Sequence, residues 1–231
     1  MSDQFAPLLL PFLPARTAMR VAHAPRWLVP LLAVVILQII LEFVAHPVRV
    51  ERTIAHLPLS ASREELGVVR TELDAALPWD LAILPISESA SVAAGALVLG
   101  LIIAAFGAGQ RPRPVLLAAL CIGLGGIGVI EKGAEIAFCS ISGHAASVPA
   151  YPWSALAVAG PVTDAYPVRL LLTIFNLFTL WYVSALGRAL AVLCNIRIAH
   201  AVLIAIVFRA VTAGCAIAVL HLLRNAYVFT F

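Results

Sequence analysis

The chain has 231 residues, of which 62% are hydrophobic and only 12% are charged, and its mean hydropathy is +1.03. A soluble domain is usually about 45–50% apolar and about 25% charged, so this excess indicates lipid-facing surface and excludes an ordinary soluble fold. The formal net charge of +3 gives no basic footprint for nucleic acid.

The first 26 residues predict a cytoplasmic arm in front of the first membrane span. Arg16, Arg20 and Arg26 outnumber Asp3, and basic residues beside a span favour the cytoplasmic side. The apolar stretch before them, FAPLLLPFLP, is too short and too rich in proline to cross a bilayer. We expect it to lie at the membrane surface or to pack as an extended arm on a partner.

A first span at about residues 27–45 and an external loop at 46–90 follow in the sequence. Within the loop, an S-x-x-E capping box begins at Ser62, and apolar residues follow it at helical spacing. Pro78 is expected to end that run. The sequence therefore predicts a short amphipathic extramembrane helix at 62–77, which lies as a lid on the bundle or on the lipid surface.

Four more apolar segments complete a prediction of five membrane spans. They lie at about residues 91–107, 114–138, 168–187 and 198–223. The turns after the second and fourth spans carry arginines, which favours the cytoplasmic side for both turns. The predicted fold is all-α, a polytopic membrane protein with a single five-helix membrane domain at 27–231. Its N-terminus is expected in the cytoplasm and its C-terminus in the periplasm.

Five ionisable residues fall within the apolar segments and form a candidate intramembrane charge cluster. They are Glu42, Glu131, Lys132, Glu135 and Arg209. An ionisable residue at bilayer depth costs at least about 2.5–3.5 kcal/mol, so each one indicates a structural or functional contact. Glu131 and Glu135 are four residues apart and share a helix face. A pair between either of them and Arg209 would tie the fifth span to the third.

Two interpretations of this charge cluster stay open. It is either a structural clasp between helices or part of a proton or ion path. The clasp is favoured because a relay needs ionisable groups through both halves of the membrane, and the inner half offers only His200.

Known catalytic patterns do not occur in the sequence. There is no GxSxG elbow, HExxH helix, Walker loop or CxxC pair. The glycine run GLGGIG at Gly123–Gly128 lies inside an apolar segment, which favours close helix packing over nucleotide binding. We therefore expect no catalytic residue, no metal site and no cofactor, and a protein that is not an enzyme.

Three stretches carry a family resemblance. They are ARTAMRVAHAPRWLVPLL, HLPLSASREELGVVRTEL and FNLFTLWYVSALGRAL. The third has an aromatic-rich apolar core followed by a small-residue turn, with Phe175, Phe178, Trp181 and Gly187 at the motif positions. Together they resemble the Yip family, the five-span membrane proteins named for Ypt/Rab-interacting proteins, in its bacterial branch.

The resemblance implies a non-enzymatic integral membrane protein that acts through protein or lipid contacts. The partners it implies are membrane lipids and other integral membrane proteins or a second copy of the chain, without nucleic acid. One alternative is an accessory or structural subunit of a large bacterial energy-transducing complex, photosynthetic or respiratory. A second alternative is a small transporter that uses the charge cluster. The expected location is the bacterial cytoplasmic (inner) membrane.

Overall fold

The computed structural model describes residues 3–23, 27–55, 62–107, 112–142, 153–155 and 175–228. These residues form a 3₁₀ helix and six α-helices. In chain order they are η1 (Asp3–Leu9), α1 (Pro14–His23), α2 (Leu28–Ala55), α3 (Arg63–Ala105), α4 (Pro114–Ser142), α7 (Leu177–Leu193) and α8 (Ile198–Val228). Within the described ranges, extended pairing is limited to one antiparallel bridge between Ser154 and Asn176. The all-α prediction is therefore confirmed.

Four helices, α2, α3, α4 and α8, are long and apolar enough to cross a membrane. The fifth apolar helix, α7, has 17 residues, whereas a crossing takes about 20. The predicted fourth span began at residue 168, and residues 168–174 lie outside the described ranges. Within the described ranges, the count of spans thus stands at four candidates and one shorter apolar helix.

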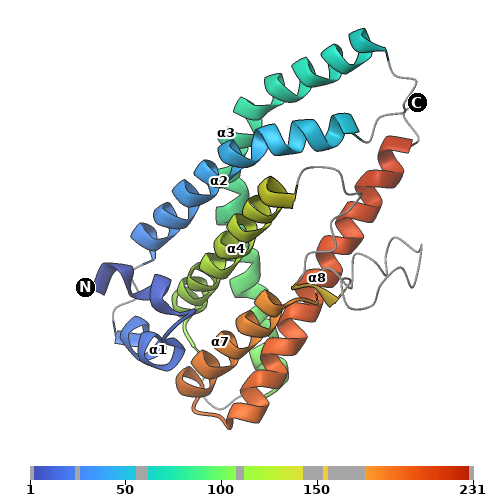
Figure 1. The fold of residues 1–231 in the computed structure, drawn as a ribbon. Coiled ribbons are helices and arrows are strands. Elements are labelled where there is room, and N and C mark those ends of the chain that lie inside the picture. The colour runs from blue at the N-terminus through green and yellow to red at the C-terminus, as the bar shows by residue number, and fades with distance from the viewer. Residues whose placement is uncertain are drawn as a thin grey trace.

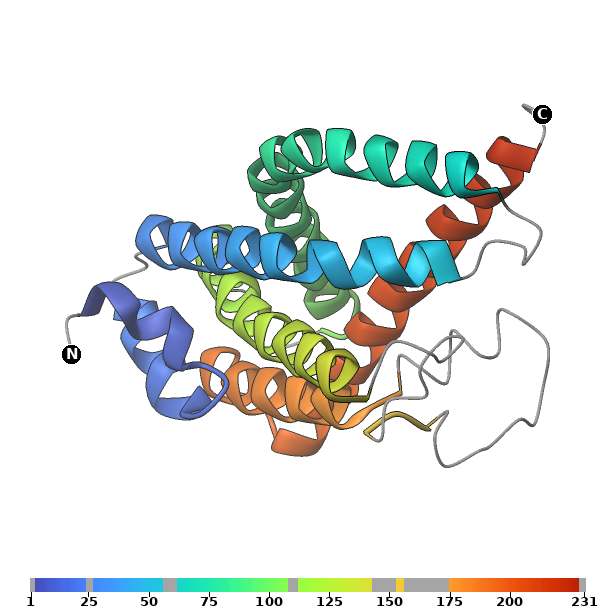
Figure 2. The same ribbon diagram turned by 45° about the horizontal axis from the view of Figure 1, so that its top comes forward.

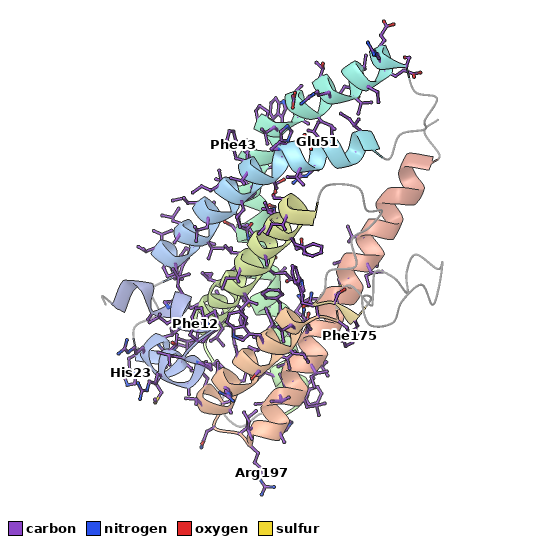
Figure 3. The ribbon with its side chains drawn as sticks, viewed as in Figure 1. Phe12, His23, Phe43, Glu51, Phe175 and Arg197 are labelled. Atoms are coloured by element: carbon purple, nitrogen blue, oxygen red, sulfur yellow. The ribbon has the colours of Figure 1, made fainter. Side chains whose placement is uncertain are left out.

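The helices run up and down between two ends of a bundle (Figure 1). The start of α2, the end of α3, the start of α4 and the turn between α7 and α8 lie at one end. Arg197 in that turn points away from the bundle (Figure 3). Two residues with positive φ close these turns: Gly107 follows α3 with a φ of 62°, and Asn195 follows α7 with a φ of 51°.

The longest helix, α3, joins two elements that the sequence predicted as separate, the helix at 62–77 and the span at 91–107. The predicted capping box is present at its start, because the Ser62 side chain accepts from the Glu65 backbone N–H and the Glu65 carboxylate accepts from Ser62 N–H. The helix then continues without a break for 43 residues. The predicted end at Pro78 is wrong.

Two prolines, Pro78 and Pro85, lie inside α3 and bend it without ending it. A proline removes one N–H from the helical ladder and crowds the turn before it, which commonly produces a kink. Figure 2 shows the consequence, since α3 runs beside α2 in its first part and then turns to run down the bundle. The bend lets one continuous helix include both the segment predicted to be extramembrane and a candidate span.

Within the predicted external loop at 46–90, residues 46–55 and 63–90 are helical. α2 continues to Ala55, well beyond the predicted end of the first span at residue 45. Its extension is tied to α3 by a hydrogen bond of 2.8 Å between His46 Nε2 and Asp74 Oδ1. At about 1.5 Å per residue, both α2 and α3 exceed the roughly 30 Å of a bilayer core.

The N-terminal arm is helical and packs on its own bundle, whereas the sequence left open a stretch at the membrane surface or an extended arm on a partner. Leu10 and Val21 are fully buried, and Pro11 O accepts a hydrogen bond of 2.7 Å from Trp181 Nε1 on α7. Gly123 on α4 lets η1 approach closely, since a Cβ built there would lie 2.4 Å from Pro7 O. The sequence predicted that the glycine run allows close packing. In the structure, the element that packs closely on Gly123 is the arm.

The main core joins α3, α4, α7 and α8. Leu99, Leu120, Leu186 and Ile204 supply one fully buried side chain from each of these helices. α7 and α8 meet most closely at Gly187, where an added Cβ would lie 3.1 Å from the Cα of Val202. A smaller cluster attaches α2 to α4.

Candidate functional site

A buried carboxylate, Glu42 of α2, lies at the centre of a charged site between α2 and α4. The residue is 7% exposed. It accepts hydrogen bonds from Arg49 Nη2 on the same helix and from Lys132 Nζ on α4. Arg49 is two helical turns further along α2, which places it on the same face as Glu42. The carboxylate therefore joins α2 to α4 and binds two cations.

A pocket of about 300 Å³ opens beside this carboxylate, between α2 and α3. Its lining residues are Glu42, Arg49, Asp80, Ile83, Leu84 and Ser87. Because Asp80 to Ser87 flank Pro85, the pocket lies at the bend of α3. We call it the bend pocket.

The two cations bound to Glu42, Arg49 of the pocket lining and Lys132 of α4 beside it, retain hydrogen-bonding capacity. The side chain of Arg49 is 43% exposed and that of Lys132 is 36% exposed. A guanidinium has five N–H donors and an ammonium has three, so each keeps donors beyond the one given to Glu42. Arg49 Nη1 lies 3.9 Å from Asp80 Oδ2, an ion pair that is longer than a hydrogen bond.

Acceptors lie on the α3 side of the same pocket. The Asp80 side chain is 53% exposed. Ser87 Oγ donates its hydrogen to Leu84 O at 2.9 Å, which leaves the hydroxyl oxygen able to accept. The bend pocket thus presents cationic donors on one side and a carboxylate with a hydroxyl on the other. Chemically, this arrangement suits a group that carries both charges.

The remaining members of the predicted charge cluster lie elsewhere. Glu131 accepts a hydrogen bond from Asn176 Nδ2, whose Oδ1 accepts from Thr179 N at 2.8 Å and caps α7. Glu135 acts electrostatically on Lys132. The cluster is therefore divided, with Glu42 and Lys132 in direct contact and Glu131 bound to α7.

Arg209 of α8 is placed over an aromatic ring. Its guanidinium carbon lies 5.2 Å from the ring centroid of Tyr182, and its buried Nε has no hydrogen-bond partner. The expected pair with Glu131 does not form, because Glu131 bonds Asn176 and α8 packs mainly on α7 and α3. Arg209 contacts Tyr182 of α7, and Glu131 bonds Asn176, the N-cap residue of α7. Both charges are therefore bound at α7.

The residues that carry the family resemblance contribute to an aromatic row. Trp181 contacts Phe12 of the arm at 5.5 Å between ring centroids, and Phe178 contacts Trp153 at 6.0 Å. Gly187 gives α8 its close approach. Phe175 is exposed.

Sequence reasoning missed Arg49, Asp80 and Ser87 as pocket residues, because it placed them in an external loop. One available signal was the seven-residue spacing of Glu42 and Arg49, which aligns them on a helix that continues past residue 45. The pairing with Asp80 had no such local signal, since it depends on the bend of α3.

No protein-family model, curated protein or solved structure matches the chain. Function is therefore inferred from the bend pocket and from the membrane-length helices.

Proposed function

We propose that this protein is a non-enzymatic, multi-pass protein of the bacterial inner membrane that acts through lipid or protein contacts, as its resemblance to the Yip family implies. Four helices of membrane-crossing length support the membrane location. The observation that carries the proposal is the bend pocket, where charged groups lie beside exposed apolar side chains. This combination suits an amphiphilic molecule, and it favours lipid contact as the mode of action.

Apolar side chains flank the bend pocket on both helices. Ile83 lines the pocket and is exposed, and Trp79 and Ile86 on α3 are exposed as well. Phe43 of α2 projects from the bundle next to Glu42 (Figure 3). Tryptophan is enriched where the membrane meets water. A lipid here would have its headgroup in the pocket and its acyl chains along these side chains.

A cytoplasmic N-terminus is part of the proposal. Arg20 lies in α1, Arg113 directly precedes α4 and Arg197 directly precedes α8, and these elements meet at one end of the bundle (Figure 1). An excess of basic residues at one end favours its placement in the cytoplasm.

Purification of the full chain from its own membranes in a mild detergent tests the proposal, with mass spectrometry of the lipids and proteins that accompany it. We expect phospholipid in at least equimolar amount and the chain as a monomer or small homo-oligomer. A stoichiometric set of redox or photosynthetic subunits would contradict the proposal and make the protein an accessory subunit. A preparation without bound lipid or protein would also contradict it.

A further inference from the structure

We infer that the bend pocket selects the headgroup of a zwitterionic aminophospholipid, with its phosphate on Arg49 and Lys132 and its ammonium on Asp80. The inference rests on the proposed lipid contact and adds the class of lipid. It follows from the charge balance of the pocket, from its unused hydrogen-bonding groups and from its depth.

The phosphate position is defined by two cations that share one carboxylate. Arg49 and Lys132 both donate to Glu42, so one buried negative charge faces two positive charges. Both cationic side chains remain partly exposed, Arg49 as a lining residue of the pocket and Lys132 through its contact with the lining residue Glu42. A phosphate oxygen accepts strong hydrogen bonds from guanidinium and ammonium groups. One phosphate can therefore share these two cations with Glu42.

The ammonium position is defined by Asp80 and Ser87 on the opposite wall. The Asp80 carboxylate is half-exposed and makes only a long contact, of 3.9 Å, with Arg49. The Ser87 hydroxyl oxygen is able to accept a hydrogen bond. A primary ammonium brings three N–H donors to these acceptors, whereas a trimethylated ammonium brings none. The pocket thus favours ethanolamine over choline.

Two further carboxylates oppose a purely anionic headgroup. Glu88 of α3 and Glu135 of α4 both act electrostatically on Lys132. Together with Glu42 and Asp80, they outnumber the two cations. Phosphatidylglycerol offers the same phosphate but no cation for Asp80, so these like charges disfavour it.

The depth of the pocket fits a headgroup at the outer side of the membrane. Along their helices, Glu42 lies about 21 Å from Leu28 and Lys132 lies about 27 Å from Pro114, at 1.5 Å per residue. Since the hydrocarbon core is about 30 Å thick, both residues fall in its outer part. Long cationic side chains at this depth extend toward the headgroups.

The test is a lipid titration of the purified full chain in detergent, followed by native mass spectrometry. Dioleoyl phosphatidylethanolamine, phosphatidylcholine and phosphatidylglycerol are the three probes. We expect the wild-type chain to bind phosphatidylethanolamine with a Kd about tenfold below that for phosphatidylglycerol, the size of one charged hydrogen bond. Asp80→Asn should remove this preference. Asp74→Asn is the matched control and should keep it, because Asp74 bonds His46 outside the pocket.

The outcomes separate the inference from the proposed function. Equal affinities of the wild-type chain for phosphatidylethanolamine and phosphatidylglycerol, or an unchanged preference in Asp80→Asn, overturn the headgroup assignment and leave lipid contact in place. The absence of saturable binding by all three lipids contradicts the proposed function itself. Displacement of the lipid by an equal concentration of soluble O-phosphoethanolamine overturns a lipid as the occupant. Asp80 is half-exposed, so its variant is expected to fold.

Discussion

A buried carboxylate is stable in an apolar helix only when its charge and its lone pairs are satisfied. Glu42 meets this condition through Arg49 and Lys132. An acidic residue is therefore tolerated on the face of α2 that packs against α4. Arg209 is different, since its guanidinium charge lies on the face of Tyr182 while its buried Nε has no hydrogen-bond partner. A desolvated cation–π contact is worth about 2 kcal/mol and offsets part of the cost of burying the charge.

Replacement of Glu42 by Gln tests whether this carboxylate is a clasp. The amide accepts weaker hydrogen bonds and leaves two positive charges without their shared counter-charge. We expect a loss of about 1–3 kcal/mol in the free energy of unfolding. The partial exposure of Arg49 and Lys132 keeps the loss below that of a fully buried pair. The measurement is thermal unfolding of the detergent-solubilised chain.

Glu72→Gln on the exposed surface of α3 is the control for Glu42→Gln and should leave stability unchanged. Proton or ion flux into proteoliposomes is measured on the same samples. A Glu42→Gln chain with wild-type stability and level that loses a wild-type flux would contradict the clasp and support a transporter.

At the scale of the elements, the arm formed by η1 and α1 can pack closely on α4 because Gly123 has no side chain. Gly123 presents bare backbone to Pro7, so the 3₁₀ helix lies directly on α4. Trp181 then binds Pro11 with its indole N–H, and the exposed side chains of Arg16 and Arg20 lie on the other face of α1. Two helices, α4 and α7, therefore hold the arm against the bundle.

Gly123→Ala should detach this arm. The added methyl group would lie 2.4 Å from Pro7 O and 3.0 Å from Leu10 Cβ, so the arm has to shift. Overpacking of this kind costs about 1–3 kcal/mol. We expect faster tryptic cleavage at Arg16 and Arg20 at an unchanged helix content by circular dichroism.

Gly128→Ala, one turn and a half further along α4, is the control because nothing lies within 4 Å of its built Cβ. It should leave the cleavage rate unchanged. Equal cleavage of the two variants would mean that the close approach at Gly123 does not hold the arm.

At the scale of the whole molecule, the two ends of α3 are proposed to lie on opposite sides of the membrane, so the orientation in the membrane can be tested by labelling. Single cysteines at Glu64 and Gln110 are introduced into a chain whose four native cysteines are replaced by serine or alanine. Glu64 lies at the start of α3, and Gln110 lies between the last residue of α3 and the first residue of α4. A membrane-impermeant maleimide should label Glu64→Cys from the periplasm and Gln110→Cys only after the membrane is opened. The reverse pattern would invert the proposed orientation.

The starts of several helices could be predicted well from local sequence. The spans expected to begin at residues 27, 114 and 198 begin at Leu28, Pro114 and Ile198. Their ends extend further than expected, to Ala55 in α2, for example. Hydropathy falls at the first charged residues, whereas the helical hydrogen bonds continue through them, so a hydropathy boundary underestimates helix length.

The helix end predicted from a proline and the ion pair predicted from charged residues were less reliable than the predicted helix starts. Pro78 fits the pattern of a helix end, yet α3 continues through it because a helix held by its neighbours can bend around a proline. The depth of Glu131 and Arg209 along their helices is compatible with a pair. Depth does not specify which helices are adjacent, and α7 packs between α4 and α8.

The sequence by itself determined the all-α class, the membrane-length helices and the capped start of α3, because these depend on residues within a few turns of one another. Tertiary structure decided the positions of the arm, the bend pocket and the partners of Glu42. These depend on how each helix is rotated about its axis and on which helix lies beside it. Both are fixed by contacts between residues as distant as Glu42 and Lys132, or Pro11 and Trp181.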